Sequence, residues 1–315
     1  MLNAQHTVSN SDSGYTLEFA QYPSRIPGAR MSKIEKRLFV VGCARSGTTL
    51  VQAMLASHSQ IHAFPETFFF LDGGFSGTPR LNPIAQIRAH RIARYALQNA
   101  LHRLGEEHAL VAKLSTRTRL VETFIRTLDR MALANGCAIW SEKTPGHVNC
   151  IGEIQRLVPG ALFVHVLRDG RDVVASLESI YREKVLASGV GGAAWPLHDS
   201  ISRWNKAIAT SESHLGEPGH FFIDYESLLR EPEVILKKLC HFIEVEYQPA
   251  MAQYYTHAST VLGGDIDDSW RRDVLRPLQS THLKKYSVLF TESEQQLLEQ
   301  KLTRQGRVSG IQREI

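Results

Sequence analysis

An arginine, two glycines and three hydroxyl side chains follow an apolar, β-branched run near residue 40. The stretch from Leu38 to Leu50 reads LFVVGCARSGTTL, and a helical pattern of apolar residues begins directly after it. In a strand–loop–helix unit, the backbone N–H groups of the loop and the positive end of the helix face one point. This chemistry suits a phosphate or sulfate group, for which the predicted ligands are Arg45, Ser46, Gly47, Thr48 and Thr49.

This loop departs from the loop of a nucleoside triphosphatase at one decisive position. Gly42 and Gly47 have the Walker A spacing, but Thr48 stands where that motif has its lysine. Nucleoside triphosphatases need the lysine and a metal ion for the β- and γ-phosphates. The cation here is Arg45, which favours an anion site that works without a metal. Three alternatives stay open: a P-loop nucleotide kinase or triphosphatase, a non-catalytic nucleotide-binding protein with a degenerate site, and a glycine-rich turn without any ligand.

A second apolar run, ALFVHVL at 161–167, ends in the segment RDGRDVVAS. Because this run is apolar on nearly both faces, we expect a central strand of a parallel sheet. Arg168 and Arg171 then stand at its carboxyl end, the edge at which open parallel sheets bind ligands. Asp169 and Asp172 carry the opposite charge, and we expect them to brace the arginines.

Strand patterns alternate with helical patterns along the chain, which is typical of a doubly wound α/β fold. We expect a P-loop-like parallel sheet flanked by helices in a single domain over residues 36–315. Residues 1–35 are polar, so we expect a loosely ordered extension, and Met31 is an alternative start to Met1. Strands are expected near 38–41, 60–64, 138–140, 161–167 and 220–226, and helices near 50–55, 84–104, 118–135, 147–157, 173–177, 197–214, 232–243 and 292–304.

Composition limits the classes of function. The 315 residues have a net charge of +4, which fits an anionic ligand but is too weak to indicate nucleic-acid binding. No apolar run approaches the ~18–20 residues that span a bilayer, and no secretory signal is visible. We therefore expect a cytoplasmic protein without a membrane span. We also expect reduced thiols, because no CxxC pair occurs among Cys43, Cys137, Cys150 and Cys240.

Both turns resemble segments of the sulfotransferases that use 3′-phosphoadenosine 5′-phosphosulfate (PAPS). Residues 42–49 resemble the 5′-phosphosulfate-binding loop of that family, and residues 168–176 resemble its 3′-phosphate-binding segment. The form RSGTT, with a Pro-Glu pair in the next turn, is similar to the bacterial and tyrosylprotein-sulfotransferase-like branch. Three further segments of this chain resemble landmarks of the family: PET at 65–67, EKTP at 142–145 and DYE at 224–226.

The resemblance implies that PAPS is the co-substrate and that no metal ion takes part. The loop from Arg45 to Thr49 would hold the 5′-phosphosulfate, and Arg168 and Ser176 would hold the 3′-phosphate. Tyr225 would lie near the adenosine or its phosphate, with an ordinary buried tyrosine as the alternative. Two further candidates for nucleotide binding lie in a basic C-terminal segment: Ser269 and Lys285.

The resemblance also implies in-line transfer of a sulfuryl group to a hydroxyl or an amine. Glu66 is the predicted general base, and we expect its apolar neighbours in FPETFFF to raise its pKa. A carboxylate that caps a helix is the alternative for Glu66. His58 and His62 are the other candidates for the base.

Lys143, together with Arg45, would stabilise the leaving oxygen, and a salt bridge with Glu142 is its alternative role. The acceptor stays open among a sugar, a peptide, a lipid and a small alcohol. The glycine-rich segments at 72–83 and 186–196 are expected to form loops that line the acceptor pocket. We expect no nucleic-acid partner, and the oligomeric state is not predicted.

Overall fold

The computed structural model describes residues 33–75, 83–106, 116–188, 197–256 and 284–302. Most of the expected N-terminal extension at 1–35 therefore lies outside the described residues. The same holds for most of the two expected glycine-rich loops and for the basic segment that contains Ser269.

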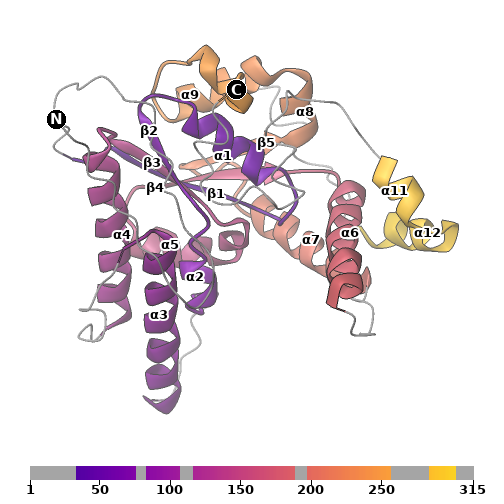
Figure 1. Ribbon diagram of the computed structural model, residues 1–315, viewed down its shortest axis with the longest axis horizontal. Coiled ribbons are helices and arrows are strands. Elements are labelled where there is room, and N and C mark those ends of the chain that lie inside the picture. The colour runs from indigo at the N-terminus through magenta and orange to yellow at the C-terminus, as the bar shows by residue number, and fades with distance from the viewer. Residues whose placement is uncertain (1–32, 76–82, 107–115, 189–196, 257–283, 303–315) are drawn as a thin grey trace.

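Five parallel strands form one sheet in the order β2-β3-β1-β4-β5 (Figure 1). Since all strands run in one direction, their carboxyl ends meet at the same edge. The chain leaves β1 towards β2 on one side and later crosses to β4 on the other, so β1 lies at the topological switch point. The strands are β1 (Lys36–Gly42), β2 (Ile61–Phe64), β3 (Ile139–Lys143), β4 (Ala161–Leu167) and β5 (His220–Asp224).

Helices lie on both sides of this sheet (Figure 1). One set contains α1 (Thr48–Ala56), α8 (Tyr225–Arg230) and α9 (Pro232–Phe242). The 3₁₀ helix η2 (Pro145–Cys150) occupies the start of the helix expected near 147–157. The other set contains α2 (Phe69–Asp72), α3 (Pro83–Arg103), α4 (Arg117–Ala134), α5 (Ile151–Leu157), α6 (Gly170–Ser188), α7 (Leu197–Glu212), α11 (Lys284–Leu289) and α12 (Glu292–Lys301).

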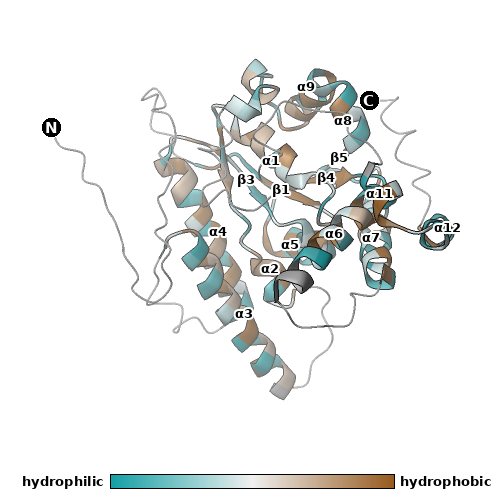
Figure 2. Cartoon of the chain, turned by 45° about the vertical axis from the view of Figure 1, so that its right-hand side comes forward, coloured by the Kyte–Doolittle hydropathy of each residue, from teal (hydrophilic) through white to brown (hydrophobic). Residues whose placement is uncertain are grey.

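Alternating side chains of β1 divide the interior into two cores. Leu38 and Val40 pack with apolar residues of α1, α8 and α9, whereas Phe39 and Val41 pack with residues of α3, α4, α6 and α7. Brown and teal residues alternate along α3 and α4 in Figure 2, as expected for helices with one buried face. The doubly wound α/β fold with helices on both faces of a parallel sheet is thereby confirmed.

Side-chain caps explain two of the element boundaries that differ from the prediction. β5 ends at Asp224, two residues early, because Asp224 Oδ1 accepts a hydrogen bond from the N–H of Ser227 at 2.9 Å and caps α8. α6 begins at Gly170, three residues early. There Asp169 Oδ1 accepts the N–H of Arg171 at 2.8 Å, which satisfies a donor in the first turn of the helix.

None of the described helices is long and apolar enough to cross a lipid bilayer. All four cysteines are buried and free. Burial raises the pKa of the Cys43 thiol to about 12, against a weaker opposite effect of Arg203. Because the thiolate is the reactive form, Cys43 is an inert packing residue even though it lies next to the predicted phosphate loop.

Candidate active site

At the carboxyl edge of the sheet, a predicted site residue or loop lies at the end of every strand. The strand order across the sheet is β2-β3-β1-β4-β5. Because the strands are parallel, residues far apart in the chain meet at this edge. In strand order they are Glu66, Lys143, the phosphate loop of residues 43–47, Arg168 and Tyr225.

The phosphate loop holds two residues in the left-handed region of backbone space. Arg45 has φ 75°, and Gly47, the N-cap of α1, has φ 96°. A Cβ atom on Gly47 would overlap the ring of Tyr225, so this position accepts glycine alone. A left-handed residue other than glycine costs about 1–3 kcal/mol, and such strain concentrates at ligand-binding sites.

The start of α1 offers backbone donors to this edge. No side chain caps this helix within the described structure, and the first N–H groups of a helix have no acceptor inside it. The N–H groups of Thr48 and Thr49 therefore stand at the positive end of α1, where anions bind.

The Ser46 hydroxyl has a hydrogen-bond partner inside the loop. It donates to the carbonyl of Cys43 at 2.7 Å, and the N–H of Ser46 donates to the same carbonyl at 3.2 Å. Ser46 is 1% exposed, so it closes the loop from inside. Binding of an anion by the Ser46 hydroxyl would require this bond to break.

The two predicted anion-binding turns are in direct contact. Arg45 Nε donates to Ser176 Oγ at 3.0 Å, although the two residues are 131 positions apart. Arg168 Nη1 donates to the carbonyl of Arg45 at 3.4 Å. Ser176 lies near the start of α6, whose N-terminus faces the same edge as that of α1. The loop after β1 and the turn after β4 thus form one site.

Acidic residues orient the arginines of this site, as expected. Arg168 Nη2 lies 3.4 Å from Asp172 Oδ2, and Arg171 Nη2 lies 2.6 Å from Asp169 Oδ2. Although burial opposes it, hydrogen bonding to Arg171 holds the pKa of Asp169 below its ordinary value. The guanidinium of Arg168 also lies over the ring of Tyr225, with Cζ 4.5 Å from the centroid. Tyr225 is half-buried between this cation and the phosphate loop.

Glu66 and Lys143 form an ion pair at the same edge. Lys143 Nζ contacts Glu66 Oε1, and their side chains are 6% and 26% exposed. The alternative role of Glu66 as a helix cap is wrong, because α2 has Phe68 as its N-cap and no side-chain cap. The alternative pairing of Lys143 with Glu142 stays open, although the Glu142 carboxylate also accepts from other donors.

Glu142 is fully buried and accepts four hydrogen bonds. Its Oε1 accepts from the N–H of Thr67 at 3.1 Å, the hydroxyl of Thr67 at 2.8 Å and the hydroxyl of Thr144 at 2.6 Å. Its Oε2 lies 3.0 Å from His147 Nδ1. Although burial opposes it, the charge of His147 and these hydrogen bonds lower the pKa of Glu142. The Glu142 carboxylate therefore ties the turn after β2 to the end of β3.

Sequence reasoning missed this role of Glu142. A signal was present, because a lone carboxylate stands in an otherwise uncharged strand segment, AIWSE, with threonines nearby. Buried carboxylates need several donors. Glu66 precedes Thr67 and Lys143 follows Glu142, so this buried carboxylate holds the backbone of both members of the ion pair.

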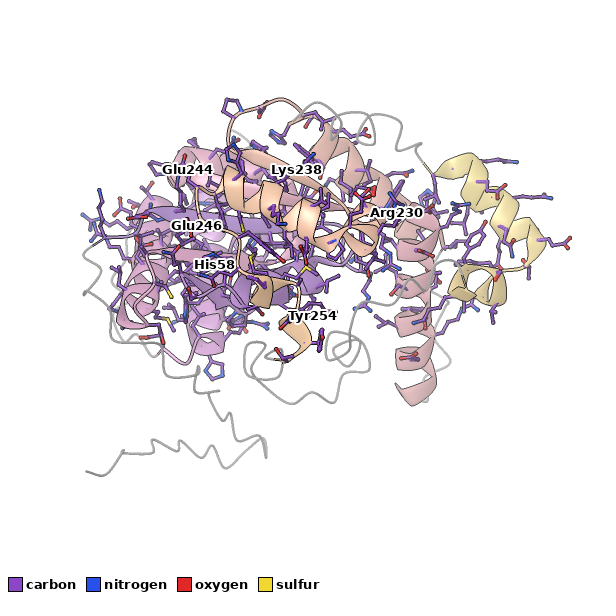
Figure 3. All side chains as sticks on the ribbon, turned by 90° about the horizontal axis from the view of Figure 1, so that it is seen from above. His58, Arg230, Lys238, Glu244, Glu246 and Tyr254 are labelled. Carbon is purple, nitrogen blue, oxygen red and sulfur yellow. The ribbon has the colours of Figure 1, made fainter. Side chains whose placement is uncertain are left out.

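The two histidines considered as alternative bases do not join the site. His58 lies beyond the C-terminal end of α1, at the opposite edge from the phosphate loop. Its Nε2 lies 2.9 Å from the carbonyl of Glu246, and Figure 3 shows the two residues close to each other. His62 is buried within β2 and packs edge-on against Phe64, with centroids 4.6 Å apart.

The C-terminal candidates remain predictions. Ser269 lies outside the described residues. The side chain of Lys285 is exposed on α11, which packs against α6. Its neighbour Tyr286 is buried, and its hydroxyl donates to the carbonyl of Gln295 at 3.2 Å.

Comparison with known proteins finds sulfotransferases among the similar sequences. The protein-tyrosine sulfotransferase 1 of Danio rerio is 23% identical over 222 residues, which cover 69% of this chain and 55% of that protein. The protein-tyrosine sulfotransferase of Drosophila melanogaster is 24% identical over 220 residues, which cover 69% and 40%. This chain thus spans about half of these relatives or less.

Solved structures share the fold. The sulfotransferase domain of the Synechococcus olefin synthase matches with a TM-score of 0.51 and 18% identity, over 86% of this chain and 96% of that domain. The mouse sulfotransferase SULT7A1, solved with PAP, matches with a TM-score of 0.52 and 12% identity, over 89% and 88%. The profile of the sulfotransferase family matches residues 37–249, which include the phosphate loop and all five strand ends. The chain therefore belongs to the sulfotransferase family.

Proposed function

We propose that this protein transfers a sulfuryl group from PAPS to a hydroxyl or an amine. Family membership supports the reaction class. The observation that carries the proposal is the contact between the two anion-binding turns, Arg45 Nε to Ser176 Oγ at 3.0 Å. A donor with a 5′-phosphosulfate and a 3′-phosphate on one ribose needs two anion sites side by side, and these two turns meet that need.

The charges at the carboxyl edge fit such a donor. Arg45 and the N–H groups of Gly47, Thr48 and Thr49 would bind the 5′-phosphosulfate at the positive end of α1. Arg168, held by Asp172, would bind the 3′-phosphate, for which the planar guanidinium is well suited. Further ligands of the nucleotide would be Ser46, Ser176, Tyr225, Ser269 and Lys285.

In the proposed reaction, the acceptor oxygen or nitrogen forms a bond to sulfur as the bond from sulfur to the bridging oxygen breaks. The carboxylate of Glu66 takes the acceptor proton, and the leaving bisphosphate carries away the negative charge. Lys143 and Arg45 stabilise that charge. Lys143 contacts Glu66, so we propose that Lys143 turns from Glu66 to the bridging oxygen when the donor binds.

The proposed acceptor carries a hydroxyl or an amine. It is a small molecule, a carbohydrate, a lipid or a peptide. Because curated relatives are protein-tyrosine sulfotransferases, tyrosine peptides belong in the first acceptor screen. A cytoplasmic location stays a prediction from the sequence.

Calorimetric titration with adenosine 3′,5′-bisphosphate tests the donor site, with ATP and Mg²⁺ as the comparison ligand. We expect the bisphosphate to bind and Mg·ATP not to bind. Arg45→Ala and Arg168→Ala should abolish binding, whereas Arg156→Ala, at an exposed ion pair with Glu153, should not change it. Binding of Mg·ATP in place of the bisphosphate would support the kinase alternative instead.

Turnover with PAPS tests the enzyme assignment separately. We expect transfer to at least one acceptor class and a strong loss of rate in Glu66→Ala. Binding of the bisphosphate with no transfer to any of the four acceptor classes would indicate a degenerate, non-catalytic site.

A further inference from the structure

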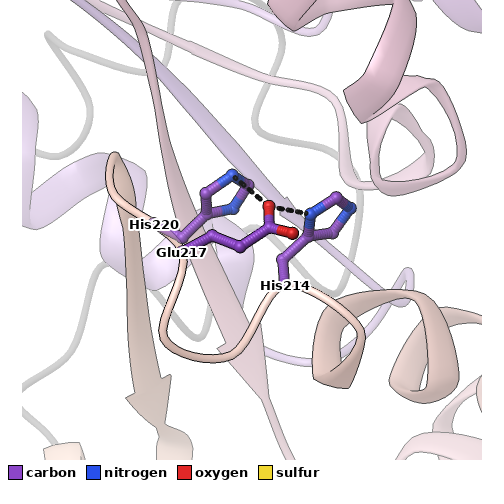
Figure 4. A group of neighbouring side chains, drawn as sticks. All are labelled: His214, Glu217 and His220. Carbon is purple, nitrogen blue, oxygen red and sulfur yellow. Dashed lines mark hydrogen bonds and ion pairs between the residues drawn. The ribbon is translucent and has the colours of Figure 1, made fainter.

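A second group of polar side chains lies at the amino edge of the sheet, opposite the donor site. It consists of His214, Glu217 and His220, in the connection from α7 to β5. One possible ligand atom from each residue lies within 4.8 Å of those of the other two. Figure 4 shows the Glu217 carboxylate between the two imidazole rings.

A tight turn brings the three residues together. The N–H of Glu217 donates to the carbonyl of His214 at 3.1 Å, and Gly216 and Gly219 have φ values of 81° and 84°. Glu217 Oε2 lies 2.7 Å from His214 Nδ1 and 3.8 Å from His220 Nε2. The two rings stack in parallel, with centroids 4.7 Å apart and an interplanar angle of 3°. Their ligand nitrogens thus flank the same carboxylate oxygen, and the more exposed His214 ring has to turn out of the stack before both nitrogens aim at one ion.

A chain of buried hydrogen bonds fixes the orientation of His220. Its Nδ1 lies 2.9 Å from His165 Nε2, and His165 Nδ1 lies 3.0 Å from the hydroxyl of Ser211. When His220 Nδ1–H donates to His165, and His165 Nδ1–H donates to Ser211, His220 Nε2 carries the lone pair, which lies 3.1 Å from the amide nitrogen of Gln155 and 3.8 Å from Glu217 Oε2. Metal-binding histidines characteristically have their other nitrogen held in this way.

From this arrangement we infer that His214, Glu217 and His220 bind a divalent transition-metal ion, with Zn²⁺ as the best-matched ion. Two imidazole nitrogens and one carboxylate oxygen are a known ligand set for zinc. Around a tetrahedral ion with bonds near 2.0–2.2 Å, ligand atoms lie about 3.4 Å apart. The observed separations of 2.7 and 3.8 Å lie on either side of this value. The proton on His214 Nδ1 moves to Nε2 as the metal takes its place.

The exposure of the cluster leaves room for ion entry. The side chains of His214, Glu217 and His220 are 17%, 48% and 0% exposed, so the ion reaches a buried nitrogen from the solvent side. The amide Nε2 of Gln155 lies 3.1 Å from His220 Nε2, at the position that the ion would take. Gln155 is exposed on α5, so its side chain is able to rotate away.

A metal ion at this position would fasten the end of α7 to the start of β5. The cluster lies at the amino ends of the strands, and the donor site lies at their carboxyl ends. We therefore assign the ion a structural role, independent of sulfuryl transfer. Failure of one assignment leaves the other intact.

Zinc titration of the full chain, without an affinity tag and after treatment with a chelator, tests this site. We expect one Zn²⁺ per chain by calorimetry and a higher Tm with Zn²⁺ than with chelator. His214→Gln and Glu217→Gln should each weaken binding by at least about tenfold and remove the rise in Tm. Gln155→Ala should tighten binding, because it removes the amide that competes for His220 Nε2.

His198→Gln is the matched control. His198 Nδ1 lies 3.6 Å from Asp199 Oδ1, so it is also a histidine beside a carboxylate, but it is 86% exposed and outside the cluster. Its replacement should leave zinc binding unchanged. Absence of stoichiometric binding to the unaltered chain would overturn the proposal. Equal binding by the unaltered chain and by folded His214→Gln and Glu217→Gln variants would overturn it as well.

Discussion

The two edges of the sheet use the same strands for opposite purposes. At the carboxyl edge, β4 leads to Arg168 and β5 leads to Tyr225, beside the uncapped start of α1. At the amino edge, β5 begins with His220, whose ring bonds to His165 within β4. The carboxyl edge concentrates guanidinium and ammonium groups, whereas the amino edge holds mostly neutral rings in a closed hydrogen-bonded chain.

The contrast between the edges suggests a division between binding and folding stability within one sheet. Charged groups and strained backbone at the carboxyl edge are suited to bind an anion, and they contribute little to packing. The hydrogen-bonded rings at the amino edge contribute to the folded state. Replacement of the side chains that face the proposed donor should therefore change activity with small effects on Tm, and replacement of the hydrogen-bonded rings at the amino edge should do the reverse.

The strongest test of this contrast is Glu66→Gln. Loss of a general base should lower kcat by about 10²–10⁴-fold, while bisphosphate binding and Tm change little. Glu217→Gln makes the same chemical change at the amino edge and should leave kcat unaltered in the presence of chelator. Comparable losses of kcat in both variants, measured with PAPS and a working acceptor, would remove the functional separation of the edges.

Arg45→Ala should have the next largest effect. Removing a cation that faces developing charge should lower kcat/KM by about 10²–10³-fold, because the leaving oxygen loses one of its two stabilising cations. Steady-state kinetics with varied PAPS would measure this loss. Arg156→Ala is the control, since that exposed arginine pairs with Glu153 away from the carboxyl edge. A full-rate Arg45→Ala enzyme would contradict the assignment of the phosphate loop.

Gly47→Ala should lower both bisphosphate binding and folding stability, so it tests whether the two properties can be separated at the carboxyl edge. The added Cβ overlaps the Tyr225 ring and forces a left-handed alanine, so we expect a loss of about 2–4 kcal/mol in unfolding free energy and weaker bisphosphate binding. Gly136→Ala separates the two causes. The φ of Gly136 is 72°, but a Cβ there meets nothing within 4 Å. In this variant, denaturant unfolding should show the cost of backbone strain alone, and calorimetry should show unaltered bisphosphate binding.

The two edges should also lose stability in different pH windows. Burial, reinforced by His214 and opposed by Glu217, lowers the pKa of His220 from 6.5 to about 4. His165, which faces His220 from β4, has a pKa lowered well below 6.5 by burial and then by His220 and His214. A histidine with a depressed folded-state pKa stabilises the fold fully above pH 6.5, and this contribution disappears as the pH falls towards 4.

At the carboxyl edge, the lowered pKa of Glu142 contributes stability that is present above pH 4.5 and is lost below it. The free energy of unfolding, measured with urea in the presence of chelator from pH 7 to 3, would distinguish the pH range of the histidines from that of Glu142. We expect His220→Gln to remove about 2 kcal/mol of the loss between pH 6.5 and 4. Glu142→Gln should flatten the curve only below pH 4.5. A His220→Gln curve parallel to that of the unaltered chain would contradict the first window.

Much of the fold was predictable from sequence, because apolar periodicity and turn residues are local signals. The run LFVVG and the run ALFVHVL predict buried parallel strands, and both are found as β1 and β4. The boundaries at Asp224 and Gly170 were missed because side-chain caps decided them. A parallel sheet was predicted, but the order of its strands was not. The order β2-β3-β1-β4-β5 depends on contacts between residues that are far apart in the chain.

The candidate site was predictable where a motif carries its own geometry. The phosphate loop and the turn after β4 are such motifs, and their arginines meet at one edge as expected. The partner of Lys143 was not predictable, because Glu142 is its neighbour in sequence and Glu66 its neighbour in space. The histidine cluster was also missed, because its meaning depends on His165 from a separate strand.

The strand order also affects how the protein folds during its synthesis. β1 emerges from the ribosome early, but its neighbours β3 and β4 follow much later, as the pairs Lys36–Ile139 and Arg37–Ala161 require. Until those strands appear, an apolar strand has both edges open, a state prone to aggregation. Slow long-range pairing prolongs this exposure. We therefore expect the nascent chain to be most prone to aggregation before β4 is complete.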